Sequence, residues 1–325
     1  MSTHLFLGCA ALAAGLLQGQ PVPVELAPLV PIDLRPALAK HVPDFGHILG
    51  FSVVQDTLHM LVRPSPRSYG PFAVVRMDLA GNVRHVVPIQ GPLEERWFLT
   101  DERTGDGYVW RRAHPTRPGS QEIVYRVTAE GRTEEAAVFE RRLQLVARWG
   151  SDFLGLGNSM CLPANIPCNL GNADPSGRAG IFLPFSQSEL ISIEPFIPAV
   201  VRLNPSNGRV ISRRIIAPEV VHHQSRMRTN PAGASMFSSY TVAQGSLWAI
   251  AMGQPMAKGA AVLRFNGEGD VQESLRCELA KDEAFASGDN PDGFMFPSAV
   301  AVSSGKLYVL DGRGLLSICA LSPRT

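Results

Sequence analysis

The sequence predicts an all-β protein folded as a β-propeller of four-stranded blades. Three observations lead to this prediction: a β-hairpin that repeats with an arginine and a turn glycine, a second repeated strand that precedes the hairpin, and glycine and proline spread along the whole chain. Short strands separated by turns and repeating about every 50–75 residues are typical of propeller blades. The 30 Gly and 26 Pro residues are not gathered in a tail, which indicates many turns and not disorder.

The repeated hairpin contains apolar residues, an arginine, a polar turn with glycine, and a second strand. Its copies are Ala73–Val83, Ile123–Thr133, Ala199–Val210 and Ala261–Val271, with Arg76, Arg126, Arg202 and Arg264 and the glycines Gly81, Gly131, Gly208 and Gly269. Glycine suits such turns because it accepts a positive φ. We expect the arginines to be surface residues that are either ion-paired or cover apolar area with their stems.

The unit that precedes each hairpin is a turn followed by a strand that opens with a large apolar residue. Its copies begin at Asp56, Gly105, Gly150, Gly245 and Gly305. Together the two units predict five blades, at 47–89, 96–140, 143–216, 235–279 and 296–321, within one domain over 21–325. A sixth blade remains an alternative and would lie in the long insertion after Gly157.

The last blade lacks a fourth strand before the chain ends. We expect the N-terminal segment Val22–Leu34 to complete it, because a propeller closed in this way has no open edge at the junction. The prolines of this segment would confine it to an outer edge.

The segment Phe296–Gly312 (FPSAVAVSSGKLYVLDG) resembles the repeat of the NHL-like and related six-bladed β-propellers. A proline precedes the inner strand, and a Gly-x-Leu-Tyr-Val-x-Asp strand follows. The resemblance is good over this blade and looser over the others. It implies architecture and an exported or scaffold-like protein, but it carries no catalytic residue.

The N-terminus predicts export. Residues 1–20 contain no Lys, Arg, Asp or Glu, and the apolar run Leu5–Leu17 is shorter than the roughly 20 residues that span a bilayer. We interpret 1–20 as a signal peptide, with a buried N-terminal helix as the alternative, and expect a periplasmic or secreted monomer without an integral membrane span. The net charge of +1 gives no support for nucleic-acid binding.

Cysteine usage fits an oxidising compartment, because four cysteines remain if Cys9 leaves with the signal peptide. Cys161 and Cys168 bracket a short proline-containing loop, and we predict a disulfide between them. Cys277 and Cys319 could pair or could be free buried thiols, and the sequence leaves both open.

Blade topology predicts which face of the propeller carries the long loops. Links between strands one and two, and between three and four, are short and share one face, called here the tight-turn face. The remaining links are long and share the opposite long-loop face, where a binding site is expected. Its candidate ligand-binding residues are Arg63, Arg111, Arg112, His114, Arg117, His222, His223, Arg226, Asp292 and Asp311.

These residues form a cationic rim with an acidic sector, which suits a protein, a carboxylate, a phosphate or a glycan that carries negative charge. A solvated surface with mutually paired charges explains them equally well. Neighbouring residues on a strand point to opposite faces, so His222 and His223 do not predict a metal site. No catalytic motif or cofactor site is predicted, although a divalent ion such as calcium stays an alternative.

The sequence therefore predicts an exported propeller that binds a protein or anionic ligand through its long-loop face. A metal-assisted hydrolase or lactonase-like enzyme is the first alternative. The segment Asn290–Gly293 (NPDG) is similar to the Pro-Asp-Gly of sugar-lactonase propellers, which hold a divalent ion with a Glu, Asn and Asp set. Only Asp292 matches locally, and NPDG is also a standard turn sequence. A purely structural protein is the second alternative.

Overall fold

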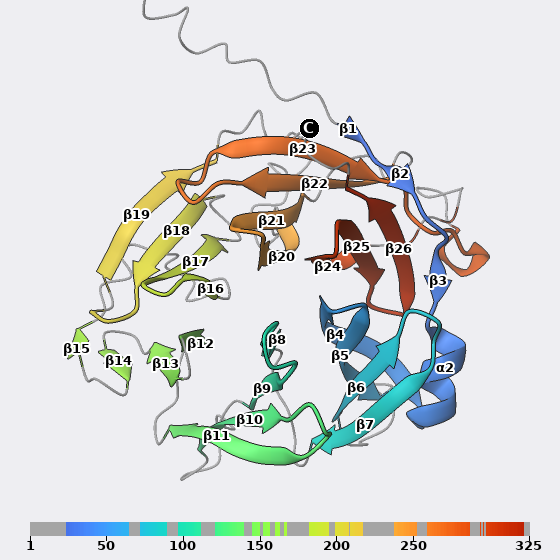
Figure 1. Ribbon diagram of the computed structural model, residues 1–325, viewed down its shortest axis with the longest axis horizontal. Helices are drawn as coiled ribbons and strands as arrows, with labels where there is room; N and C mark the ends of the chain where they lie inside the picture. The colour runs from blue at the N-terminus through green and yellow to red at the C-terminus, as the bar shows by residue number, and fades with distance from the viewer. Residues whose placement is uncertain are drawn as a thin grey trace, which may run out of the picture.

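The computed structural model describes the backbone of most strands and turns. The described residues are 24–64, 72–89, 97–111, 121–139, 145–149, 152–156, 160–162, 166–167, 182–194, 199–207, 209–216, 237–251, 259–286, 293, 295 and 297–321. They form six β-sheets arranged as a ring around a central axis, which confirms the predicted β-propeller (Figure 1). Each blade is a sheet of consecutive antiparallel strands whose first strand lies nearest the axis.

Blades 1 and 2 follow the predicted strand order. Blade 1 contains β4 (Phe45–Val54), β5 (Thr57–Pro64), β6 (Phe72–Asp78) and β7 (Val83–Ile89). Blade 2 contains β8 (Trp97–Thr100), β9 (Gly107–Arg111), β10 (Glu122–Val127) and β11 (Thr133–Phe139).

The range 143–216, counted from the sequence as one blade, contains two four-stranded sheets. Blade 3 contains β12 (Leu145–Trp149), β13 (Asp152–Leu156), β14 (Met160–Leu162) and β15 (Ile166–Pro167). Blade 4 contains β16 (Leu183–Ser186), β17 (Glu189–Glu194), β18 (Ala199–Asn204) and β19 (Arg209–Ile215). The described residues therefore form six blades, which was the alternative to the predicted five. The sequence did not predict blade 3 as a separate blade, because its outer strands are very short and lack the Arg-turn-Gly hairpin.

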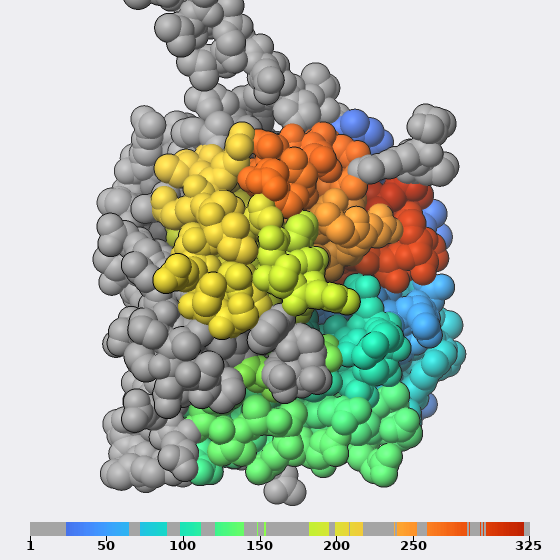
Figure 2. Space-filling view, turned by 60° about the vertical axis from the view of Figure 1, so that its left-hand side comes forward, coloured from blue at the N-terminus to red at the C-terminus, as the bar shows by residue number. Residues whose placement is uncertain are grey.

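Blades 5 and 6 complete the ring. Blade 5 contains β20 (Phe237–Ala243), β21 (Ser246–Ala251), β22 (Ala260–Phe265) and β23 (Val271–Cys277). Blade 6 contains β24 (Pro297–Ser303), β25 (Lys306–Asp311) and β26 (Leu315–Ala320), preceded by the 3₁₀ turn η2 (Glu283–Phe285). Figure 2 shows blades 4 and 5 side by side on the outer surface, in yellow and orange.

The N-terminal segment completes blade 6, as predicted. Strands β2 (Ala27–Pro28) and β3 (Ile32–Asp33) pair antiparallel with β26 at its outer edge. The shorter β1 (Val24–Glu25) pairs parallel with β23 of blade 5, so the segment joins two blades (Figure 1). Helix α2 (Arg35–His41) then leads into blade 1 and buries Leu38.

A disulfide joins the same two blades. It connects Cys277, the last residue of β23, to Cys319 in β26, and both side chains are fully buried. Of the two possibilities that the sequence left open for this pair, the structure contains the bridge. The predicted Cys161–Cys168 disulfide lies outside the described residues, because Cys168 is not among them.

The hydrophobic core lies between neighbouring blades. One cluster joins Trp248 and Val262 of blade 5 to Leu307 and Val309 of blade 6, and another joins blade 6 to blade 1 and to Leu38 of α2. Because each sheet buries both faces against its neighbours, the second strands are apolar almost throughout, as in β21, where all residues are buried.

The tight turns have the backbone that the sequence predicts. Gln244 and Gly245 both have positive φ (52° and 65°), as do Ser304 and Gly305 (50° and 69°). Two successive residues with positive φ form the hairpin turn whose twist matches the flanking strands. The short links are thus fixed on the tight-turn face.

Candidate functional site: the central channel

The innermost strands of the blades surround a central channel with a cavity volume of about 540 Å³. Strands β4, β8, β12, β16, β20 and β24 all contribute to its wall, and each is the last strand of its sheet. Such strands carry one row of backbone N–H and C=O groups that no neighbouring strand pairs. The channel therefore offers backbone donors and acceptors on all sides, in a volume typical of small-molecule sites.

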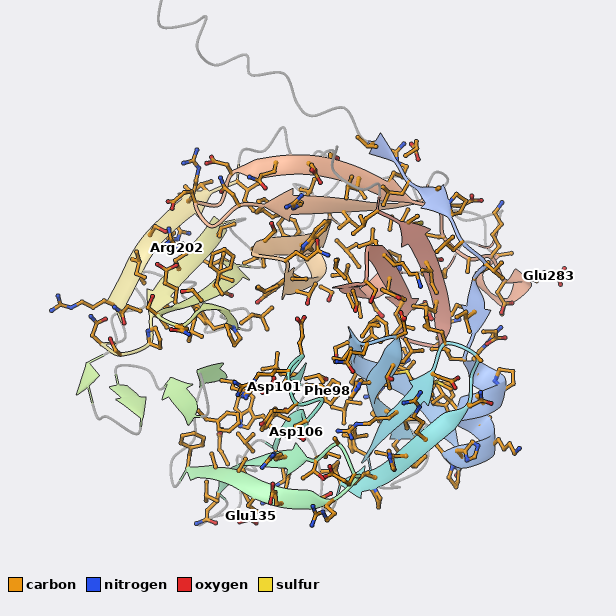
Figure 3. All side chains as sticks on the ribbon, in the orientation of Figure 1. Phe98, Asp101, Asp106, Glu135, Arg202 and Glu283 are labelled. Atoms are coloured by element: carbon orange, nitrogen blue, oxygen red, sulfur yellow. A yellow bond between two sulfur atoms is a disulfide. The ribbon has the colours of Figure 1, made fainter. Side chains whose placement is uncertain are left out.

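Most side chains that line the channel are apolar or carry hydroxyl groups. Phe51 and Phe98 lie on adjacent blades, and the hydroxyl groups of Ser52 and Thr100 are hydrogen-bonded to each other across the junction of blades 1 and 2. A Cβ atom at Gly50 would lie 2.4 Å from Cβ of Phe98, so only glycine lets these two blades approach closely here. Figure 3 shows Phe98 and Asp101 on the side of blade 2 that faces the central opening.

Three charged residues line the channel: Asp101, Glu102 and Arg148. Nη2 of Arg148 lies 2.6 Å from Oδ2 of Asp101, and the two side chains are only 13% and 11% exposed. The Arg148 guanidinium also lies 4.5 Å from the centre of the Tyr108 ring. This pair joins the first strand of blade 3 to the β8–β9 turn of blade 2.

The two acidic residues have different ionisation behaviour. Burial acts to raise the pKa of Asp101, but the hydrogen bond from Arg148 and those from the backbone N–H groups of Arg103 and Thr104 outweigh it, so the pKa is lowered. The pKa of Glu102 is raised, because neighbouring protein atoms desolvate its carboxyl group and the negative charge of Asp101 lies beside it. Asp101 is thus a paired carboxylate, whereas Glu102 is a less favourable place for negative charge.

No sequence pattern marks these residues as part of a site. Strand pairing places Arg148 opposite Phe153, and the corresponding first-strand residues of other blades are Ser52, Leu99, Thr241 and Ala301. Arg148 is the one charged residue in this set. An alignment of the blades on the second-strand aromatic would have identified it as a departure from the repeat.

Three of the predicted ligand-binding residues lie among the described residues, and all three lie near the ends of second strands. Nε of Arg63 is buried with no hydrogen-bond partner in the described part of the chain, and the Arg111 guanidinium lies 5.5 Å from the centre of the Tyr125 ring. Asp311 is buried, and its Oδ1 accepts a hydrogen bond from the N–H of Arg313 at 2.6 Å. Asp311 therefore holds the β25–β26 turn.

The other predicted site residues cannot be placed, because they fall outside the described residues. They are Arg112, His114, Arg117, His222, His223, Arg226 and Asp292. Asp282 is an acidic residue in the same long link between blades 5 and 6 as Asp292. Nη1 of Arg35 lies 2.5 Å from its Oδ2. Part of the acidic sector thus attaches the N-terminal segment to the propeller.

Within the described ranges, no group of three or more His, Cys, Asp or Glu side chains is arranged to hold a metal ion. His222, His223 and Asp292 lie outside these ranges, so the metal-assisted alternative stays a prediction. In the same ranges no helix is long and apolar enough to cross a membrane.

Comparison with known proteins supports the fold and no specific activity. No protein-family model matches the sequence, and no curated protein matches it. A protein of unknown function from Bacteroides thetaiotaomicron is similar in structure, with a TM-score of 0.52 and 11% identity over 90% of this chain and 73% of that chain.

Two further solved structures align over nearly their full length. A catalytically inactive virginiamycin B lyase from Staphylococcus aureus, solved with quinupristin, has a TM-score of 0.49 and 10% identity over 90% of this chain and 99% of that chain. BamB from Moraxella catarrhalis has a TM-score of 0.41 and 11% identity over 92% and 99%. At such identities the likeness is one of fold alone.

Proposed function

We propose that this chain is an exported β-propeller binding protein that recognises a protein or anionic ligand on its long-loop face, with part of the ligand entering the central channel. The observation that carries the proposal is the channel of about 540 Å³, to which all six innermost strands contribute. Ligand sites in proteins are commonly concave, largely apolar and preformed by a rigid scaffold.

Two features support a positively charged site on the long-loop face. Arg63 and Arg111 lie at the long-loop ends of β5 and β9, so positive charge is present on this face. The Arg63 Nε is buried without a described partner, and an anionic group could supply the acceptor that a buried donor requires.

Export is supported by the buried bridge between Cys277 and Cys319, since disulfides persist in oxidising compartments and are rare in the cytosol. Together with the apolar run Leu5–Leu17, this makes a periplasmic or secreted location the proposed one.

Binding can be tested with named anionic probes: citrate, inorganic phosphate and a heparin-derived disaccharide. Titration calorimetry on the full chain should detect at least one of them. Ser298→Trp places bulk at an exposed position on the innermost strand β24, and Arg111→Ala removes a positive charge. Each should weaken the affinity for that probe by about tenfold or more, the factor expected when a charge-assisted hydrogen bond, or access to it, is lost.

The matched control is Thr133→Trp, which places the same bulk on the exposed outermost strand β11. It should bind like the wild type. Failure of every probe to bind, or equal affinity in all variants, would contradict the proposal.

A further inference from the structure

Among the described lining residues, the tight-turn mouth of the channel carries one negative charge that no ion pair balances. Of the charged lining residues, Asp101 and Arg148 neutralise each other in a short ion pair. Glu102 is the lining charge that remains, and the ion pairs of the described residues do not include it.

Apart from the Asp101–Arg148 pair, the residues that line the channel near Glu102 are uncharged. The lining residues at the same end of the channel are Val54 from β4, Ala243, Gln244 and Gly245 from blade 5, and Val302 from β24. No lysine, arginine or histidine other than the engaged Arg148 is among the residues that line the cavity. Within the described part of the chain, no ion pair supplies the Glu102 carboxylate with a counter-charge, although it lies at the entrance to a cavity lined mainly by uncharged side chains.

We infer that the tight-turn mouth binds an ammonium group attached to an apolar body, with Glu102 as its counter-ion and the channel wall around the apolar part. The geometry matches this chemistry because a carboxylate accepts hydrogen bonds from an ammonium group, while Phe51 and Phe98 supply apolar surface within the same cavity. The raised pKa of Glu102 is consistent with a site that is completed by a cation.

The ammonium site rests on the same channel as the proposed function, but it lies at the tight-turn mouth and takes a cation, whereas the proposed function places an anionic ligand on the long-loop face. The ammonium group could belong to a free amine or to a lysine side chain of a peptide, since the two share the same chemistry. Both sources are included in the test.

The test compares three probes of one length by titration calorimetry on the full chain: n-hexylammonium, hexan-1-ol and hexanoate. Wild-type protein should bind hexylammonium about tenfold more tightly than hexanol, which corresponds to one charge-assisted hydrogen bond. Glu102→Gln should abolish this preference, and Glu102→Lys should transfer it to hexanoate. Because Glu102 is exposed in a turn, neither change should unfold the protein.

The matched control is Glu130→Gln, which removes an exposed carboxylate from the β10–β11 turn on the same face. It should keep the wild-type preference. A blocked pentapeptide, Ala-Ala-Lys-Ala-Ala, distinguishes the sources: tighter binding than hexylammonium assigns the site to protein lysines, and weaker binding assigns it to free amines.

The outcomes separate this inference from the proposed function. If the anionic probes bind at the long-loop face but hexylammonium and hexanol bind equally, the ammonium site is overturned and the proposed function stands. If hexylammonium keeps its preference in Glu102→Gln, the site is likewise overturned. If only the ammonium preference is found, the inference holds and the proposed function fails.

Discussion

Single residues of the repeat connect one blade to the next. The repeated arginine lies opposite the second-strand aromatic in two blades, at Arg126–Tyr108 and Arg264–Trp248, and opposite His59 in blade 1 as Arg76. Arg76 and Arg264 are only 4% and 7% exposed, so the expectation of surface residues was wrong for both. The expected ion pairs are present at Arg126, Arg202 and Arg264.

Arg76 shows most clearly what the repeated arginine does. Its Nη1 and Nη2 donate hydrogen bonds to the carbonyl oxygens of Thr128 and Val127 in blade 2, at 2.6 and 2.8 Å. Arg202 similarly reaches Glu268 in blade 5 from blade 4. Arg76 and Arg202 thus connect neighbouring blades, whereas Arg126 and Arg264 are paired within their own blades.

Replacing Arg76 by methionine should lower the free energy of unfolding by about 2–4 kcal/mol, because two buried carbonyl oxygens lose their charged donor. Chemical denaturation measures the change. Arg132→Met is the control, since the Arg132 side chain is 80% exposed, and it should be nearly neutral. Equal effects of the two substitutions would show that Arg76 does not connect the blades.

His59 gives the protein a pH dependence that can be assigned to one residue. Burial lowers the pKa of His59 to about 4, with the positive charges of Arg76 and Arg84 adding to the effect, and its Nδ1 has no described hydrogen-bond partner. The native state therefore holds His59 neutral, while the unfolded state protonates it near pH 6.5. Its contribution to stability is complete above pH 6.5 and is lost as the pH falls toward 4.

Between pH 7 and pH 5 the wild type should lose about 2 kcal/mol more unfolding free energy than His59→Phe. Phenylalanine is the replacement because the equivalent residues of other blades are aromatic, as at Tyr108 and Trp248. Denaturation at both pH values measures this difference, with the exposed His41→Gln as control. The assignment fails if His59→Phe has the wild-type pH dependence.

At the scale of elements, the N-terminal segment and the disulfide act on the same junction. The segment adds β1 to β23 and adds β2 and β3 to β26, while Cys277 and Cys319 link these two outer strands covalently. The Arg276–Glu25 and Arg35–Asp282 ion pairs hold the segment at its two ends. The junction of blades 5 and 6 is thus held both by the N-terminal segment and by a disulfide.

Removing the Cys277–Cys319 bridge should lower the free energy of unfolding by about 2–4 kcal/mol, because the link closes a loop with a sequence separation of 42. The measurement is denaturation of wild type and of Cys277→Ala/Cys319→Ala, each with and without reductant. The reductant should destabilise the wild type more than the double variant, in which only the predicted Cys161–Cys168 bridge remains to be reduced. An equal response of both proteins would mean that the bridge does not stabilise the ring.

At the scale of the whole molecule, the ring creates the site. The channel exists only because six first strands are brought to one axis, and its charge pair joins Asp101 to Arg148, residues 47 positions apart. Neither residue belongs to a motif. Sequence patterns could therefore predict the scaffold and the faces, but not which side chains meet at the axis.

The sequence by itself determined the all-β class, the hairpins with their turn residues, and closure by the N-terminal segment. The strands and hairpins depend on period-two alternation and on backbone angles within a few residues, which the local sequence fixes. Closure was predictable because the last blade lacks a strand and the N-terminal segment is the one that can supply it. The tertiary structure alone decided the division of 143–216 into two sheets, the burial of Arg76, and the channel with Glu102 at its mouth. The reason is physical: these depend on contacts between blades, whose residues are distant in sequence and are brought together only when the ring closes.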